Sequence, residues 1–147
     1  ALAPFLAYEN RGIFVLCHTS NPGAADFQRL PLDGSPLYEE VARRTVEWNE
    51  AHSNCGLVVG ATQAGCMARV RQLAPDLPFL VPGVGSQGGD LESAVGDGLK
   101  ADGTGVLVNA SRSIIFASSG DDFAEAARAA TVALRDQINS TRQQTRT

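Results

Sequence analysis

Four short apolar runs alternate with four segments of helical periodicity along this chain of 147 residues. The runs are continuously apolar rather than alternating with polar residues, which is typical of strands buried on both faces. Strict alternation of strands and helices predicts a parallel sheet in the α/β class, because parallel neighbours need a crossover between them. The predicted strands are residues 12–17, 55–59, 77–81 and 105–108.

The helical segments carry recognisable start and stop signals. They span 36–51, 63–73, 90–99 and a long last segment that opens at Asp121 and Asp122. In the first helix, Ser35 is placed as the cap and Pro36 suits the first turn. Residues at helical spacing predict the buried faces of the first helix (Leu37, Val41, Thr45 and Trp48) and of the last helix (Phe123, Ala127, Ala130 and Leu134). The polar residues 141–147 are expected to fray.

Two stretches, 81–90 and 108–115, each close a predicted strand and open a helix. In a (β/α)₈ barrel, the loops after the last two strands commonly form a phosphate site with a short extra helix. The glycine-rich turn lets backbone N–H groups approach an anion, Gln87 adds an amide donor, and Arg112 offers a planar bidentate fork. These stretches predict the two halves of a phosphate clamp.

The number of strands limits how much of a barrel this chain can form. A closed barrel typically needs about 250 residues, so four β/α units are too few. If the barrel interpretation holds, residues 1–147 form the C-terminal half of one TIM-type (β/α)₈ domain, about strands 5 to 8, with no linker and no second domain. Residues 1–8 have neither an initiator Met nor a signal-peptide pattern, which indicates the inside of an element.

Composition excludes several classes of function. With 44% hydrophobic and 19% charged residues, the chain is predicted to be globular rather than disordered. A net charge of −4 without a basic block argues against a nucleic-acid partner, and no segment is long and apolar enough for a membrane span. A cytoplasmic location is the default expectation. The cysteines Cys17, Cys55 and Cys66 are odd in number and widely spaced, which favours free buried thiols over disulfides or a metal site.

Four segments together carry a family resemblance: residues 14–24 (FVLCHTSNPGA), 56–62 (GLVVGAT), 80–90 (LVPGVGSQGGD) and 109–112 (NASR). In this order and context they resemble orotidine 5′-phosphate decarboxylases, most closely the bacterial subgroup that includes mycobacterial enzymes. The resemblance runs from Pro4 to the final helix. Four loops at matched spacing are far more specific than any one of them.

The resemblance implies a lyase without cofactor or metal that converts orotidine 5′-monophosphate to uridine 5′-monophosphate and carbon dioxide in pyrimidine synthesis. It implies a barrel that is usually a homodimer. Carried over residue by residue, Ser20 contacts the pyrimidine amide edge and Pro82 and Val84 wall the site. Gln87 and the turn of Ser111 and Arg112 hold the phosphate.

The family's reacting residues have no counterpart in this chain. They form an Asp-x-Lys-x-x-Asp motif and an earlier Asp in the N-terminal half, where the Lys protonates the carbanion left by carbon dioxide. Here the one lysine is Lys100, with Asp97 three residues before it and Asp102 two residues after it. Lys100 also precedes the fourth strand, at the stability face of a barrel, so it is predicted to be a solvated loop residue. The chain alone is therefore expected to be inactive.

Other interpretations remain open for several residues. Residues 83–88 match G-x-G-x-x-G, a dinucleotide fingerprint, but the next strand ends in Asn109 with no acid for a ribose hydroxyl. The plain alternatives are that Arg112 is a structural arginine, Gln87 a loop amide and Ser20 a turn residue. His18 is expected to be packed or hydrogen-bonded rather than catalytic. For the whole chain, the alternative is a non-catalytic, phosphate-binding half barrel that associates with itself.

Overall fold

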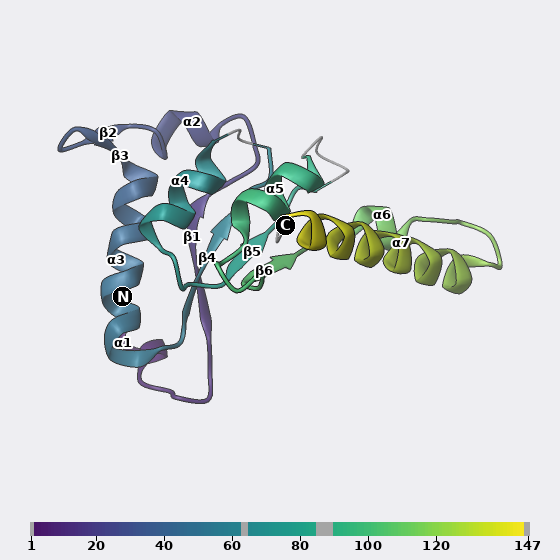
Figure 1. Cartoon of the computed structure of the whole chain (residues 1–147), viewed down its shortest axis with the longest axis horizontal. Coiled ribbons are helices and arrows are strands. Elements are labelled where there is room, and N and C mark those ends of the chain that lie inside the picture. Colours follow the sequence, from purple (N-terminus) through teal and green to yellow (C-terminus); the bar gives the residue numbers. More distant parts are fainter. Residues whose placement is uncertain (1, 63–64, 85–89, 146–147) are drawn as a thin grey trace.

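The computed structural model describes residues 2–62, 65–84 and 90–145, and Figure 1 shows their arrangement. A parallel sheet is formed by β1 (Ile13–His18), β4 (Cys55–Val59), β5 (Phe79–Val81) and β6 (Val106–Val108). A two-stranded antiparallel ribbon is formed by β2 (Pro31–Leu32) and β3 (Ser35–Pro36). The helices are α1 (Ala3–Leu6), α2 (Ala24–Phe27), α3 (Leu37–His52), α4 (Cys66–Leu73), α5 (Leu91–Gly98), α6 (Arg112–Ile115) and α7 (Phe123–Gln144).

The main sheet has the order β1-β4-β5-β6, and every neighbouring pair is parallel. Each strand is therefore followed by a helical crossover before the next strand, which confirms the predicted α/β class. All four strands run the same way, so their carboxyl ends meet at one edge of the sheet. In this part of the chain, both β1 and β6 are outer strands of the sheet.

Helices cover one face of the sheet and leave the other face open. The core lies on the covered face, where strand residues such as Leu57 and Phe79 pack with Met67 and Val70 of α4. Side chains alternate across a strand, so Leu16 and Leu107 point to the other face, where they are 57% and 51% exposed. The register joins a row across this open face, namely Leu16, Val58, Leu80 and Leu107.

The first long helix buries only part of the predicted face: Thr45 is buried as expected and Val41 packs against the core. In α3 the buried side chains are Tyr38, Glu39, Ala42 and Thr45, whereas Trp48 is 37% exposed. The cap prediction for Ser35 is also wrong, because Ser35 belongs to β3 and the N-cap is Pro36 without a side-chain bond. The β2–β3 pairing lies at the entry to α3, where Leu37 N–H and Tyr38 N–H donate to the carbonyls of Leu30 and Gln28, both at 2.9 Å.

The last helix is longer than expected. It continues to Gln144, and Thr141 is buried with its hydroxyl bonded to the carbonyl of Gln137. Arg142 adds a bond to the carbonyl of Gly103 at 2.9 Å, so the predicted fraying from residue 141 is wrong as far as Gln144. Phe123, expected on the buried face, is 63% exposed because α6 and the start of α7 extend away from the sheet (Figure 1).

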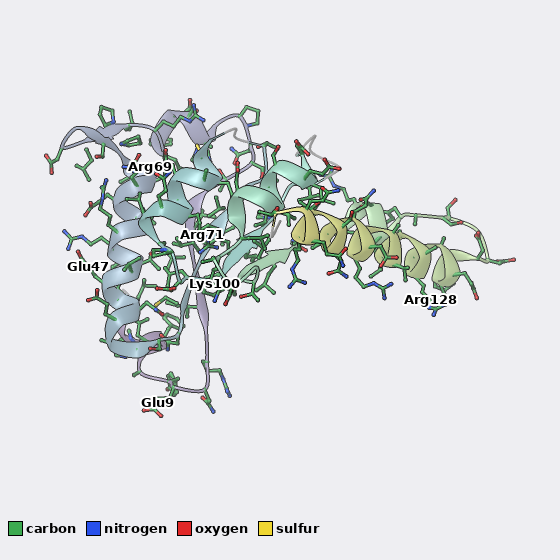
Figure 2. All side chains as sticks on the ribbon, in the orientation of Figure 1. Glu9, Glu47, Arg69, Arg71, Lys100 and Arg128 are labelled. Atoms are coloured by element: carbon green, nitrogen blue, oxygen red, sulfur yellow. The ribbon has the colours of Figure 1, made fainter. Side chains whose placement is uncertain are left out.

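The amino-terminal edge of the sheet is held together by Arg71, which Figure 2 labels near the centre of the molecule. Its guanidinium donates to the carbonyls of Gly98 (2.6 and 2.9 Å), Ala74 (2.9 Å) and Leu77 (2.8 Å). It also lies 3.6 Å from the ring centroid of Phe79. Burial lowers the pKa of Arg71 to about 10, so the group is still charged at neutral pH. One side chain thus joins α4, α5 and β5.

Replacing Arg71 should strongly destabilise the chain. We expect Arg71→Met to lower the free energy of unfolding by about 3 kcal/mol, because several buried carbonyls lose a charged donor while the aliphatic packing is kept. Arg71→Lys should recover only a part, since a single ammonium cannot reach carbonyls on opposite sides. Urea denaturation measures both variants, and a loss no larger than that of the exposed Arg128→Met would contradict this role.

Candidate functional site

The carboxyl ends of the four parallel strands bring the predicted site loops to one edge of the sheet. Three backbone bonds join these loops in sequence: Gly60 N–H to His18 O at 2.8 Å, Ala61 N–H to Pro82 O at 3.1 Å, and Asn109 N–H to Val81 O at 3.0 Å. The loops after β1, β4, β5 and β6 are therefore direct neighbours. In parallel α/β proteins, ligands bind at this edge.

Ser20 occupies the centre of this edge. Its hydroxyl donates to the carbonyl of Pro82 at 3.1 Å, and its own carbonyl accepts the hydroxyl of Thr62 at 2.8 Å. Ser20 thus links the loops after β1, β4 and β5, whose residues lie 42 and 62 positions away in the sequence. It is half-buried and can reach a ligand at the edge. A local turn role alone does not account for these long-range bonds.

Gly60 lets the loops after β1 and β4 approach this closely. A Cβ atom at this position would lie 2.6 Å from the backbone nitrogen of Ser20 and 2.9 Å from its Cα. Real Cβ atoms essentially never come that near to another backbone, so a larger residue would displace Ser20. The glycine is needed here for space rather than for an unusual backbone angle.

The predicted phosphate residues are only partly described. Ser111 and Arg112 are exposed at the start of α6, directly after the loop that follows β6. Within residues 2–62, 65–84 and 90–145, the structure records no hydrogen bond or ion pair of the Arg112 guanidinium, and none to a helix C-terminus. Gln87 lies outside the described residues. The structure therefore gives Arg112 the exposure that a ligand contact needs.

Val84 is placed differently from Pro82. It is 6% exposed, belongs to the core, and lines an apolar cavity of about 260 Å³ between α5, α6 and α7. The other lining residues are Leu91, Ala110, Ser113, Ile114, Ala130, Ala133, Leu134 and Gln137. Pro82, in contrast, is half-buried at the edge and accepts two of the bonds that join the loops. The contact of Val84 with a ligand stays a prediction.

His18 ends β1, next to the edge, and is completely buried. Its ring meets Tyr38 edge-on at 5.2 Å between centroids, and neither ring nitrogen has a hydrogen-bond partner in the described part of the chain. Burial lowers the pKa of His18, and the positive charge of Arg29 lowers it further. The ring is thus packed, as predicted, and is neutral at pH 7.

The buried His18 should make stability depend on pH. Below its ordinary pKa of 6.5 the unfolded chain binds a proton that the folded chain does not, so stability falls as the pH drops below that value. The slope cannot exceed about 1.4 kcal/mol per pH unit, the value for one proton taken up on unfolding. His18→Phe should remove this slope and match or exceed the parent stability at pH 7, because no buried nitrogen is left unpaired. Urea denaturation at pH 7.5, 6.5 and 5.5 measures it, with the exposed His52→Asn as control. An unchanged slope in His18→Phe would contradict this origin.

Lys100 lies away from the candidate site, and the cysteines are free. Lys100 precedes β6, at the opposite edge from Ser20, and pairs with Asp102 at 3.4 Å. Its side chain is only 26% exposed and packs along Gly105, so it is less solvated than predicted. Cys17, Cys55 and Cys66 are free and buried, as expected, and burial raises the pKa of Cys17 to about 12.

None of the helices within the described ranges is long and apolar enough to cross a membrane.

Comparison with known families supports the resemblance seen in the sequence. Residues 2–130 match the family described as "Orotidine 5'-phosphate decarboxylase / HUMPS family". The orotidine 5′-phosphate decarboxylase of Cellvibrio japonicus is 54% identical over 142 residues, which cover 97% of this chain and 52% of that protein. The enzyme of the same name from Azoarcus is 54% identical over 95% of this chain and 52% of its own length. The chain therefore spans about half the length of these curated relatives.

Solved structures agree on the fold. The OMP decarboxylase of Leishmania donovani has a TM-score of 0.84 at 43% identity, covering 96% of this chain and 52% of that chain. The UMP synthase of the same organism has a TM-score of 0.82 at 45% identity, with 96% of this chain and 30% of that chain covered. The predicted fold class is confirmed, because the parallel β/α units correspond to about half of the TIM barrel of these neighbours.

Proposed function

Because the chain belongs to the orotidine 5′-phosphate decarboxylase / HUMPS family, we propose that it is the substrate-binding, C-terminal half of an orotidine 5′-phosphate decarboxylase. The complete enzyme is a lyase that converts orotidine 5′-monophosphate to uridine 5′-monophosphate and carbon dioxide in pyrimidine synthesis, without a cofactor. The observation that supports this best is the edge where four strand-end loops meet around Ser20, with Arg112 exposed at the start of α6.

The roles follow from the chemistry of each side chain. The Ser20 hydroxyl donates or accepts a hydrogen bond at the pyrimidine amide edge, and Pro82 and Val84 wall the base. Gln87, Ser111 and Arg112 bind the phosphate, and the Arg112 fork matches two phosphate oxygens. Binding energy from this remote phosphate then supports chemistry at the base. The residues that exchange protons at the reacting carbon belong to the N-terminal half of the barrel.

The open face of the sheet supports the proposal that this chain forms one half of a barrel. Leu16 and Leu107 are exposed on it, and β1 and β6 end the sheet with unpaired edges. Beyond β6, the exposed side chains of Ile115, Phe116 and Phe123 add apolar surface on the part that extends from the sheet (Figure 1). The N-terminal half of the same barrel covers this surface and pairs both edges. We also propose that the complete enzyme is a homodimer in the cytoplasm. The resemblance to the bacterial subgroup that includes mycobacterial enzymes stays a prediction.

This open face predicts that the isolated chain does not stay monomeric. Apolar edges and faces associate with whatever is available, so sedimentation at micromolar concentration should show dimers or larger species. Leu107→Asp, which puts a charge at the β6 end of the exposed row, should shift the chain toward monomer. Trp48→Gln, on the helical side, should not. A stable parent monomer that unfolds cooperatively would contradict an open half barrel.

The function is tested by completing the barrel. We define the completed barrel as this chain joined behind the N-terminal half of the Cellvibrio japonicus relative. It should release carbon dioxide from orotidine 5′-monophosphate, because the family's reacting residues and this chain's loops are then in one fold. Binding of uridine 5′-monophosphate without turnover by a folded completed barrel would favour the alternative, a non-catalytic phosphate-binding half barrel that associates with itself.

A further inference from the structure

We propose that Thr62 is a positioning residue that holds Ser20 at the base-binding edge. The inference rests on the proposed role of Ser20 and adds a residue to which the family resemblance gives no role. Thr62 lies in the loop that follows β4, and its hydroxyl donates to the carbonyl of Ser20 at 2.8 Å. Because the hydroxyl is engaged with a backbone carbonyl, Thr62 acts on a ligand through Ser20.

Ser20 needs such support because the segment before it is irregular. The register of β1 against β4 shifts between Leu16 and His18, so the regular ladder ends just before the site. After the strand, Thr19 is held by Gln28, whose side-chain oxygen accepts the Thr19 N–H at 2.8 Å. The backbone of Gln28 is itself fixed, since its carbonyl accepts the Tyr38 N–H at 2.9 Å. These bonds anchor the loop on the side of α2 and α3.

Thr62 supplies the anchor on the other side. With Gly60 packed against the backbone of Ser20, the loop after β4 meets Ser20 both by contact and by the Thr62 bond. Fixing the Ser20 carbonyl fixes its peptide plane, and thereby the direction in which its Cα–Cβ bond presents the hydroxyl. The Ser20 hydroxyl, which here donates to the carbonyl of Pro82 at 3.1 Å, then rotates toward the base while the Ser20 backbone stays in place.

A change of this kind should alter catalysis more than folding. In the completed barrel we expect Thr62→Val to lower kcat/KM for orotidine 5′-monophosphate about ten- to a hundredfold, the scale for a catalytic-site group displaced by about 1 Å. Thr62→Ser keeps the hydroxyl and should restore most of the activity. The matched control is Thr45→Val, which removes a buried hydroxyl bonded at the same 2.8 Å to Val41 but far from the edge. It should lower the melting temperature without changing kcat/KM.

A double-mutant cycle with Ser20→Ala tests whether Thr62 acts through Ser20. If Thr62 acts through Ser20, then Thr62→Val should add little to the defect of Ser20→Ala, because the two residues act as one unit. Two outcomes overturn the positioning role and leave the proposed function intact. In one, the defects of the two single variants multiply in the double variant. In the other, the Thr62→Val enzyme is fully active beside an impaired Ser20→Ala enzyme. An unimpaired Ser20→Ala enzyme overturns the positioning role of Thr62 and the base contact of Ser20, whereas its turnover still supports the proposed function. Thermal unfolding of the Ser20→Ala and Thr62→Val variants of the 147-residue chain must match the parent, and a large loss for Thr62→Val there assigns the residue to folding instead.

Discussion

The isolated 147-residue chain should release no carbon dioxide from orotidine 5′-monophosphate above the uncatalysed rate. It contains the proposed phosphate and base contacts, but Lys100 lies at the opposite edge of the sheet and pairs with Asp102. Binding the phosphate end cannot lower the barrier when no group stabilises or protonates the carbon that loses carbon dioxide. The expected difference between this chain and the completed barrel is therefore the whole enzymatic rate enhancement.

The measurement follows labelled carbon dioxide from the purified chain after its intact mass has been verified. Uridine 5′-monophosphate should still bind weakly, because Ser20 and the turn of Ser111 and Arg112 are present. Mixing the chain with the separately purified N-terminal half should restore turnover, which also tests the open sheet face as their contact. Turnover by the chain alone would show that the reacting groups lie within these residues and would require a different assignment.

The sequence was sufficient for the parallel core but not for the orientation of its helices. Cys55–Val59 matches its predicted bounds and the other three strands differ by one or two residues at their ends, because continuous apolar runs have few alternatives in an α/β chain. The predicted face of α3 was right at Thr45 but shifted elsewhere, because Leu37 and Val41 lie one position from the buried Tyr38 and Ala42, and one step around a helix decides burial. The ribbon β2–β3 before this helix was missed as well, because its two-residue strands are too short for a periodic signal.

The polar residues that join the elements were also missed. Glu39 is buried and accepts two bonds from Arg69 of α4, at 2.8 and 3.0 Å, and these bonds hold the pKa of its carboxyl below the usual range. A Glu in the first turn of a helix is otherwise read as exposed. Arg71 did carry a signal, since a basic residue in the last turn of a helix, here just before Pro75, often bonds terminal carbonyls.

The candidate site was predictable as a place but not as a network. Parallel strands place their carboxyl ends at one edge, so the order of strands and helices along the chain already predicts that Ser20, Pro82 and Ser111 lie near one another. The bonds between Ser20, Thr62 and Pro82 were not predictable, because they depend on loop backbones that approach across Gly60. A threonine after a strand has no sequence pattern that tells a positioning hydroxyl from a solvated one.

Arg112→Ala in the completed barrel should lower kcat/KM for orotidine 5′-monophosphate by roughly 2 to 4 kcal/mol, the scale for removing a charged partner of a bound anion. The guanidinium is exposed and has no recorded partner within the described ranges, so its removal should leave the melting temperature unchanged. Against a substrate without the phosphate, the same variant should behave like the parent. The exposed Arg128→Ala, on α7, is the control for the loss of a positive charge.

Two further variants separate the phosphate from the base. Gln87→Ala should show the same dependence on the phosphate with a smaller loss, because a neutral amide contributes less than a charged donor. Ser20→Ala should impair both substrates alike, since its proposed contact is to the base that both contain. If Arg112 is instead structural, its loss should impair both substrates equally and lower the melting temperature, as expected for Arg71→Met. That outcome would withdraw the phosphate assignment of Arg112, whereas the role of Ser20 would still stand on its own variant.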